Sequence, residues 1–332
     1  MSPLPVVAGI LTDPVGRVLV SQRLPGKPMA GRWEFPGGKL ERGEDRLAGL
    51  YRELEEELGV RVTSARPLIR FVHEYLGLAV SLDIWRIREF AGLPFGRQGQ
   101  ALRWVEPAAL SEIDLLEADR PILTAISLPD RYLITGPPFD DEAVFLTRLD
   151  AALEGGIELV QLRMPGVAPL SGLPRSEGKA EGPAAYRARA IHCLGRCRSA
   201  GARLLLNGAP RSMTQLAAEI GADGIQVPAR YLDSLRDIRG ARPSLIGASC
   251  HDAQELELAE RAGADFAVLG PVERTVSHPG NRPIGWRRFA ALVASTRMPV
   301  YALGGMQSEK LAQAWAAGAQ GIAAISALWA PP

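Results

Sequence analysis

The sequence predicts two units in series: an α+β unit over residues 1–128 and an α/β unit over residues 131–332, the second a (β/α)8 TIM barrel. Three observations support this division. At 332 residues the chain is longer than one ordinary domain of roughly 100–200 residues. The first part mixes strand-like runs with one strong helix, whereas the second alternates short apolar strands with helices. The segment SLPD at residues 127–130 separates the two patterns.

The composition excludes several classes of partner. Lys and Arg number 38 against 37 Asp and Glu, a formal net charge of +1, so no basic excess favours a nucleic-acid polymer. The cysteines, Cys193, Cys197 and Cys250, lack the spacing of a zinc site or a disulfide framework. No basic segment precedes the first apolar run, and no run approaches the roughly 18 apolar residues of a membrane helix. We expect a cytoplasmic protein without a membrane partner.

The first unit combines strand-like runs with one amphipathic helix. The runs VVAGILT, RVLVSQR, AVSLDIWRI and ALRWVEP have the β-branched, partly alternating character of strands. Between them, Leu47, Leu50, Tyr51, Leu54 and Leu58 follow an i, i+3, i+4, i+7, i+11 spacing. This spacing places one apolar stripe on a helix, and we expect the stripe to dock on the core.

Three carboxylates share another face of the same helix. Glu53, Glu56 and Glu57 stand at i, i+3 and i+4, within side-chain reach of one another. Clustered hard oxygen ligands suit Mg²⁺ or Mn²⁺, and the carbonyl of Gly38 in the preceding loop is our choice for a further ligand. The alternative is a solvated acidic face with pairs such as Arg52 and Glu56.

The run from Gly38 onward, GKLERGEDRLAGLYRELEEELGV, fits the signature of the Nudix hydrolases at every specified position. This resemblance implies an α/β/α sandwich and metal-dependent cleavage of a pyrophosphate linkage. It also implies site roles: Glu56 and Glu57 as metal ligands, Glu53 as ligand or base, Arg52 as the residue that orients a glutamate, and Glu44 as support.

Over almost all of residues 5–125 the first unit resembles the MutT branch of that family. The resemblance lies in VAGILTD, SQRLPGKPMAGRWEFPGGKLERGE, LPFGRQGQALRWVEPAAL and EADRPIL. It implies hydrolysis of 8-oxo-dGTP to the monophosphate and pyrophosphate, which sanitises the nucleotide pool and serves DNA repair. Arg23 then reaches substrate phosphates and Phe35 lines the base pocket. The alternatives are an ordinary exposed arginine and plain core packing.

Two residues depart from the MutT pattern. Gln98 stands where that branch has a metal-binding glutamate, and it could still coordinate through its amide oxygen. Asp119 stands where an asparagine reads the purine edge. An ionised aspartate accepts hydrogen bonds from guanine N1–H and the amino group but donates none to O6. The alternative for Asp119 is a turn residue before Pro121.

The second unit contains eight strand-like runs. They are RYLIT, IELVQLR, RLLLN, DGIQV, SLIGAS, DFAVLG, PVYAL and GIAAI, with helical segments between them. Eight β/α alternations in about 200 residues match the requirement of a TIM barrel.

From Arg131 to Leu328 this unit resembles thiamine phosphate synthase and its TenI-like relatives. The matching pieces are YLIT, LVQLR, LLLN, GADGIQV, IGAS, ADFAVLGPVERT, ALGG and GIAAIS. The resemblance implies a phosphate cup at Gly304 and Gly305, after the seventh strand, and at Ser326, after the eighth. A phosphorylated thiazole or thiamine-related ligand would bind there. The alternative is that the glycines only make tight turns.

The catalytic end of this second resemblance is altered. Gln161 and Arg163 are followed by Met164 and Pro165, where thiamine phosphate synthases have a glutamate and a lysine. Asn207 is followed by Gly208, where they have an aspartate. Gln226-Val227-Pro228-Ala229 replaces an acidic metal-binding motif, and His278 replaces a lysine. Without these carboxylates we expect the barrel to be degenerate and not to synthesise thiamine phosphate.

Three functional hypotheses follow. The first is a Mg²⁺-dependent 8-oxo-dGTP diphosphatase fused to a degenerate barrel. The second keeps the Nudix chemistry but takes a thiamine-pathway pyrophosphate. In the third the barrel binds a phosphorylated ligand without chemistry. A metal-free tautomerase using His251 or His278 also stays open, whereas His192 is expected to be structural.

Overall fold

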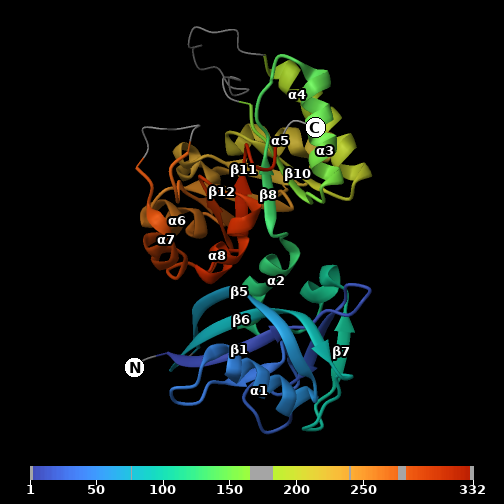
Figure 1. Ribbon diagram of the computed structural model, residues 1–332, viewed down its shortest axis with the longest axis vertical. Helices are drawn as coiled ribbons and strands as arrows, with labels where there is room; N and C mark the ends of the chain where they lie inside the picture. The colour runs from blue at the N-terminus through green and yellow to red at the C-terminus, as the bar shows by residue number, and fades with distance from the viewer. Residues whose placement is uncertain (1–2, 76, 165–181, 239–240, 276–281, 330–332) are drawn as a thin grey trace. The chain divides into compact units, whose positions relative to one another are not determined.

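The computed structural model describes residues 3–75, 77–164, 182–238, 241–275 and 282–329. The chain forms two compact units, Met1–Leu128 and Pro129–Pro332 (Figure 1). Within the described residues, no helix has the length and apolar character needed to cross a bilayer.

The first unit contains two sheets. The four-stranded sheet has the order β4-β1-β6-β5, and the three-stranded sheet has the order β3-β2-β7. In the larger sheet β1 runs parallel to β6, whereas its pairing with β4 is antiparallel. The strands are β1 (Leu4–Ile10), β2 (Val18–Gln22), β3 (Trp33–Glu34), β4 (Gly37–Lys39), β5 (Arg61–Tyr75), β6 (Leu78–Ala91) and β7 (Leu102–Val105).

Helices α1 (Arg46–Leu58) and α2 (Arg120–Ser127) cover separate apolar clusters (Figure 1). Successive residues of a strand point to opposite faces, and β1 shows the consequence. Ala8 and Ile10 join the cluster that contains Ile122 of α2, while Val7 joins the cluster with Leu54 of α1. The result is the predicted α/β/α sandwich. Two 3-10 turns, Pro107–Glu112 and Glu117–Asp119, lead into α2.

Helix α1 confirms the predicted apolar stripe, since Leu50, Leu54 and Leu58 are fully buried. The helix starts where Asp45 accepts hydrogen bonds from two backbone N–H groups of the first turn, at 2.9 and 3.1 Å. It ends at Gly59, whose φ of 68° is the left-handed conformation common after a helix. Both ends are therefore fixed, which holds the acidic face in a defined position.

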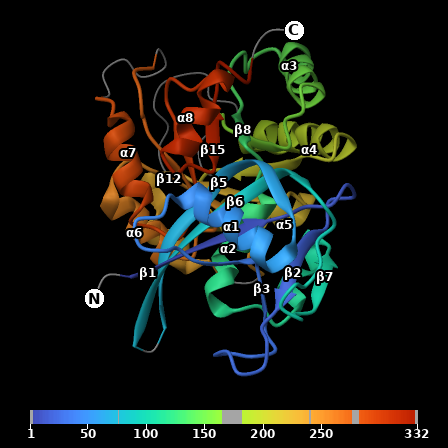
Figure 2. The same ribbon diagram turned by 60° about the horizontal axis from the view of Figure 1, so that its bottom comes forward.

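The second unit is a closed barrel of parallel strands in the order β10-β11-β12-β13-β14-β15-β8-β9, as the sequence predicts. Helices α3, α4, α6 and α7 surround the strands (Figure 2). The strands are β8 (Arg131–Ile134), β9 (Leu159–Leu162), β10 (Arg203–Asn207), β11 (Gly224–Val227), β12 (Leu245–Cys250), β13 (Phe266–Leu269), β14 (Val300–Leu303) and β15 (Gly321–Ala324).

The connections of the barrel are mainly helical. The α-helices are α3 (Glu142–Glu154), α4 (Pro183–Ser199), α5 (Pro210–Ile220), α6 (Ala253–Arg261), α7 (Gly285–Val293) and α8 (Leu311–Ala316). The 3-10 turns Ala229–Tyr231 and Asp233–Asp237 follow β11, and the turn Ser308–Lys310 precedes α8.

Candidate functional site

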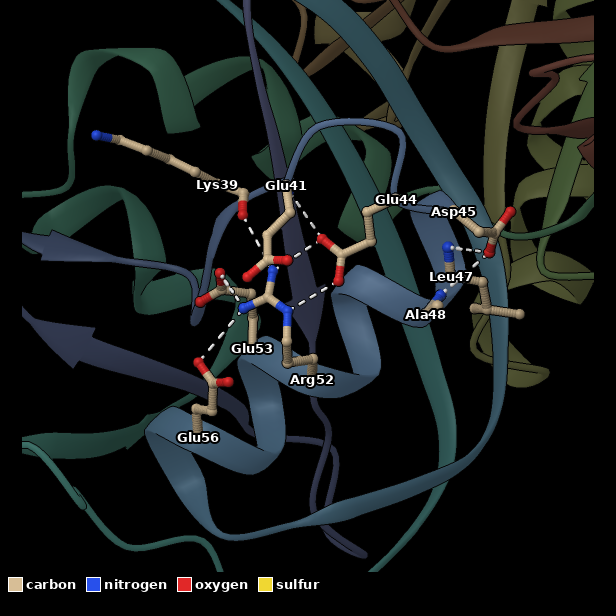
Figure 3. A network of polar contacts seen from close by, with 9 residues as sticks. All are labelled: Lys39, Glu41, Glu44, Asp45, Leu47, Ala48, Arg52, Glu53 and Glu56. Atoms are coloured by element: carbon tan, nitrogen blue, oxygen red, sulfur yellow. Dashed lines mark hydrogen bonds and ion pairs between the residues drawn. The ribbon is translucent and has the colours of Figure 1, made fainter.

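Arg52 of α1 is the centre of a polar network on the acidic face (Figure 3). Its Nε and Nη2 donate to the two carboxylate oxygens of Glu44 at 2.8 and 2.9 Å. Its Nη1 donates to Glu53 at 2.8 Å and to Glu56 at 3.3 Å. Bidentate, charge-assisted bonds of this kind fix direction as well as distance. The hydrogen bonds from Arg52 lower the pKa of Glu44 to about 2, so Glu44 is an ionised anchor for Arg52.

The carboxylate of Glu53 lies against the backbone of Gly38 in β4. A Cβ at residue 38 would stand 2.1 Å from Glu53 Oε2, so only glycine leaves this space. Beside it, the Gly37 N–H donates to Glu57 Oε2 at 3.1 Å. Burial, followed by the charges of Glu34 and Glu53, raises the pKa of Glu57 to about 7. A cation bound beside Glu57 would offset both the cost of burying its carboxylate and the repulsion by Glu34 and Glu53.

In the residues that the structure describes, no three His, Cys, Asp or Glu side chains converge into a metal-binding group. Arg52 holds Glu53 and Glu56, while the Gly37 N–H holds Glu57. These residues nevertheless fit a hard divalent cation, because their carboxylate oxygens lie beside the backbone of Gly38, which has no side chain to fill the space. The Glu56 carboxylate is 57% exposed, so it can rotate from Arg52 toward a cation.

Replacing Gly38 by alanine is expected to displace Glu53. The new Cβ would meet all three terminal atoms of that carboxyl within 2.7 Å. A shift of about 1 Å in a reacting group costs on the order of 10²-fold in rate, and we expect a loss of that size in kcat/KM for pyrophosphate release. Gly195→Ala is the control, since a Cβ there meets no atom within 4 Å. Unchanged turnover in Gly38→Ala would contradict a role for the Glu53 position.

The residues predicted to touch the nucleotide gather around Glu34. Arg23 is not an ordinary exposed arginine: its guanidinium pairs with Glu34 and donates to the Pro28 carbonyl at 2.8 Å. Phe35 is 4% exposed and packs in the apolar cluster on the α2 face. This is the core packing given above as the alternative to a place in the base pocket. Its backbone N–H is hydrogen-bonded to the carboxyl of Asp119.

Asp119 is buried in the 3-10 turn before α2, with 5% of its surface exposed. Its Oδ2 has no hydrogen-bond partner among the described residues. Burial, reinforced by the negative charge of Glu34, raises the pKa of Asp119 to about 8. At neutral pH the carboxyl is therefore protonated, and it carries one donor and one acceptor. An unpaired buried group of this type favours a polar ligand.

Gln98, predicted as a metal ligand, has an exposed side chain. Its backbone N–H donates to the side-chain oxygen of Gln100 at 2.9 Å. Gln100 is buried and in turn donates to the Glu57 carbonyl at 3.0 Å. Gln100 therefore helps to tie this loop to α1, together with the backbone N–H groups of Arg97 and Phe95, which donate to the Glu57 and Leu58 carbonyls at 3.0 and 3.1 Å.

Sequence reasoning missed Glu34 and Gln100. Glu34 is an acidic residue between the aromatic residues Trp33 and Phe35, at the end of a strand. A single acidic residue in an aromatic segment could have marked it as a candidate site residue. Gln100 follows a glycine in the loop GRQGQ, and nothing in its local sequence marks it. Both act through contacts that only the folded chain creates.

In the second unit, Gly304 and Gly305 form a sharp turn after β14, with φ values of 95° and 68°. A Cβ at Gly304 would lie 2.7 Å from Pro271, and one at Gly305 would lie 2.9 Å from Glu273. Two loops therefore approach closely here. The Glu273 carboxylate beside the turn is paired with Lys310 and accepts from Trp286 Nε1 at 2.8 Å. Ser326 is exposed, just after β15.

The interior of the barrel carries an uncharged polar network. Tyr132 donates to Gln226 at 3.0 Å and accepts from Gln161 at 3.2 Å. Asn207 donates to Gln161 at 3.0 Å, and Gln226 donates to Ser249 at 3.1 Å. These uncharged side chains thus hydrogen-bond to one another, which satisfies their buried polar groups.

The histidines differ in setting. His251 follows β12, is exposed, and its Nδ1 lies 2.9 Å from Glu255. His192 lies on α4 and pairs with Glu142. His278 lies outside the described residues.

Comparison with known proteins identifies both units. Residues 6–125 match the family model described as NUDIX domain, and residues 131–328 match the model described as thiamine monophosphate synthase. The chain belongs to the thiamine monophosphate synthase family and carries a Nudix domain. It is therefore a Nudix hydrolase joined to a thiamine phosphate synthase-like barrel.

Relatives of the Nudix domain include proteins named for two nucleotides. An 8-oxo-dGTP diphosphatase of Haemophilus influenzae is 43% identical over 105 residues, which cover 32% of this chain and 77% of that protein. A CTP pyrophosphohydrolase of Escherichia coli is 36% identical over 125 residues, covering 38% and 92%. For the barrel, a thiamine-phosphate synthase of Azorhizobium caulinodans is 31% identical over 204 residues, covering 60% and 87%.

Proposed function

We propose that the Nudix domain hydrolyses nucleoside triphosphates to the monophosphate and pyrophosphate, with 8-oxo-dGTP as the preferred substrate and Mg²⁺ or Mn²⁺ as cofactor. The observation that carries the proposal is the arrangement of Glu53 between Arg52 and the bare backbone of Gly38. Glu56, Glu57, Glu53 and the Gly38 carbonyl would hold the cation. When bound, the cation would neutralise negative charge on the phosphates.

The residues of the chain have separate tasks in this proposal. Arg52 fixes the direction of the Glu53 carboxylate, and Glu44 holds Arg52. Glu53 sits where it can accept a proton from the attacking water, because one oxygen is fixed by Arg52 and the other faces Gly38. Arg23, half-buried beside Glu34, supplies positive charge for the phosphates. In this proposal Gln98, which is exposed in the segment GRQGQ, is a further ligand of the cation.

Asp119 is proposed to read the base as a neutral acid. With its pKa raised to about 8, it donates one hydrogen bond to guanine O6 and accepts one from N1–H. This donor–acceptor pair resembles that of an amide. Its Oδ2, which has no hydrogen-bond partner in the part of the chain that the structure describes, supports the proposal, and Phe35 contributes its backbone N–H to the orientation of the carboxyl.

The test is substrate turnover by the full-length protein with Mg²⁺, with pyrophosphate and phosphate both measured, because cleavage of the linkage in thiamine pyrophosphate releases phosphate. We expect kcat/KM to be highest for 8-oxo-dGTP among 8-oxo-dGTP, dGTP, CTP and thiamine pyrophosphate. The products from a nucleoside triphosphate should be the monophosphate and pyrophosphate, and EDTA should abolish turnover. A higher kcat/KM for CTP would overturn the base assignment, and release of single phosphates from a nucleoside triphosphate would overturn the reaction.

A second candidate substrate is a pyrophosphate of thiamine metabolism. The observation that favours it is the barrel's membership in the thiamine monophosphate synthase family. In this version the Nudix domain trims the pyrophosphate, and the turn at Gly304 and Gly305, with Ser326, holds the phosphorylated product. Fastest turnover of thiamine pyrophosphate in the same assay would establish it in place of 8-oxo-dGTP. We propose that the barrel itself synthesises no thiamine phosphate.

A further inference from the structure

The loop that joins β2 to β3 is held in a defined shape by its own hydrogen bonds. It begins with a turn, LPGK at residues 24–27, in which the Lys27 N–H donates to the Leu24 carbonyl at 3.3 Å. Proline at the second position of this turn, and glycine with a φ of 88° at the third, are typical of a type II turn. The Arg23 Nε donates to the Pro28 carbonyl at 2.8 Å and so braces the next residue. Lys27 therefore occupies a fixed place in an ordered loop.

Lys27 carries a positive charge that is free to meet an anion. Its side chain is exposed, and in the part of the chain that the structure describes no carboxylate forms an ion pair with it. Arg23 differs, because its half-buried guanidinium is paired with Glu34. The charge of Arg23 is thus largely offset by a neighbour, whereas that of Lys27 stays available.

The backbone places this loop beside the acidic face of α1. Arg23, which braces the loop, is paired with Glu34 of β3. Three residues further along, the Gly37 N–H donates to Glu57 Oε2 at 3.1 Å. The segment 34–37 thus links the loop to a carboxylate that is proposed to hold the cation.

The charge of Lys27 acts at the metal end of the site and not at the base end. Burial raises the pKa of Glu57, and the positive charge of Lys27 opposes that rise. Burial also raises the pKa of Asp119, but there the cation that opposes the rise is Arg23 and not Lys27. Because a Coulomb interaction weakens with distance, Lys27 lies nearer to the proposed metal ligands than to the proposed base reader.

We propose, on the basis of the function proposed above, that Lys27 binds the β- and γ-phosphates of the nucleoside triphosphate, the part that leaves as pyrophosphate. A lysine ammonium is a compact, adaptable charge with three donors for phosphate oxygens. It adds to the charge of a divalent cation, which alone leaves a triphosphate negative. Lys27 is then a specificity-determining residue, because it favours a triphosphate over the monophosphate product.

The test compares Lys27→Gln with the parent in steady-state turnover of 8-oxo-dGTP with Mg²⁺, and uses the two products as inhibitors. We expect KM to rise about 10-fold through loss of a charge-assisted hydrogen bond, with kcat within about twofold, because substrate and transition state share the contact. The inhibition constant of inorganic pyrophosphate should rise by a similar factor, whereas that of 8-oxo-dGMP should change by less than about twofold. Lys27→Arg keeps the charge and should stay close to the parent.

Arg103→Gln is the matched control. It removes an exposed positive charge from β7, in the same three-stranded sheet, and should leave all of these constants unchanged. The proposal is overturned if pyrophosphate inhibits Lys27→Gln as strongly as it inhibits the parent. It is also overturned if 8-oxo-dGMP loses as much affinity as pyrophosphate, or if Arg103→Gln has the same effect as Lys27→Gln.

Titration calorimetry of the full chain with inorganic pyrophosphate and Mg²⁺ separates this proposal from the proposed function, since binding needs no turnover. If the parent hydrolyses no nucleotide, the proposed function fails. A Kd for pyrophosphate about 10-fold weaker in Lys27→Gln would still support Lys27 as a phosphate-binding residue. No binding by the parent, or equal Kd values in the two proteins, would overturn that role.

Discussion

Glu53→Gln is expected to reduce kcat for pyrophosphate release by about 10²–10⁴-fold, the range typical of losing a positioned general acid or base. Glutamine keeps the size of the side chain but cannot accept a proton from water at neutral pH. It also removes the negative partner of Arg52, whose Nη1 donates to Glu53 at 2.8 Å. Both changes act on the reacting geometry, so KM should change far less than kcat.

Glu55→Gln is the matched control for that variant. Glu55 lies on the same helix with an exposed side chain, so its loss removes one charge without touching the Arg52 network. We expect kcat within about twofold of the parent, since surface substitutions away from a site are nearly neutral. Steady-state kinetics of both variants with 8-oxo-dGTP and Mg²⁺ make the comparison. Equal activity of Glu53→Gln and Glu55→Gln would remove Glu53 from the mechanism.

Asp119→Asn is expected to stabilise the Nudix domain at neutral pH and to flatten its pH dependence. The carboxyl ionises near 3.8 when unfolded and at about 8 when folded. Between these values the folded state holds one proton more than the unfolded state. The free energy of unfolding therefore falls as pH rises, by up to about 1.4 kcal/mol per pH unit, and the fall is complete above pH 8. Asparagine has no such proton.

At pH 7 the asparagine variant should exceed the parent in unfolding free energy by roughly 4 kcal/mol. Urea unfolding of the full chain at pH 5, 6, 7, 8 and 9 measures this, with hydrogen–deuterium pulse labelling so that peptides of residues 4–128 report on the Nudix domain. Asp114→Asn is the control, because Asp114 is 72% exposed. A constant difference between parent and Asp119→Asn across this pH range would mean that Asp119 is ionised throughout.

The same pair of proteins tests how the base is read. If the neutral carboxyl donates to guanine O6, preference for 8-oxo-dGTP over a nucleotide without that acceptor should decline in the parent above pH 8. In Asp119→Asn it should persist, because the amide donor does not titrate. Competition assays at pH 7 and pH 9 compare the two directly.

The sequence by itself determined the fold class of both units. The apolar stripe from Leu47 to Leu58 fixed the buried face of α1 because helical periodicity is a local property. Eight strand–helix alternations likewise determined the barrel. The Nudix signature, read together with that stripe, also located the carboxylates of the acidic face, since residues three and four apart on a helix are always neighbours.

Only the tertiary structure decided which groups meet across the sequence. It paired Glu34 with Arg23 and left Asp119 Oδ2 without a hydrogen-bond partner among the described residues. It also gave the side-chain hydrogen bond to Glu57 to Gln100 and not to Gln98. Burial and charge in these places come from residues distant along the chain. A pKa or an unbalanced charge depends on the whole surroundings of a group, which sequence periodicity does not contain.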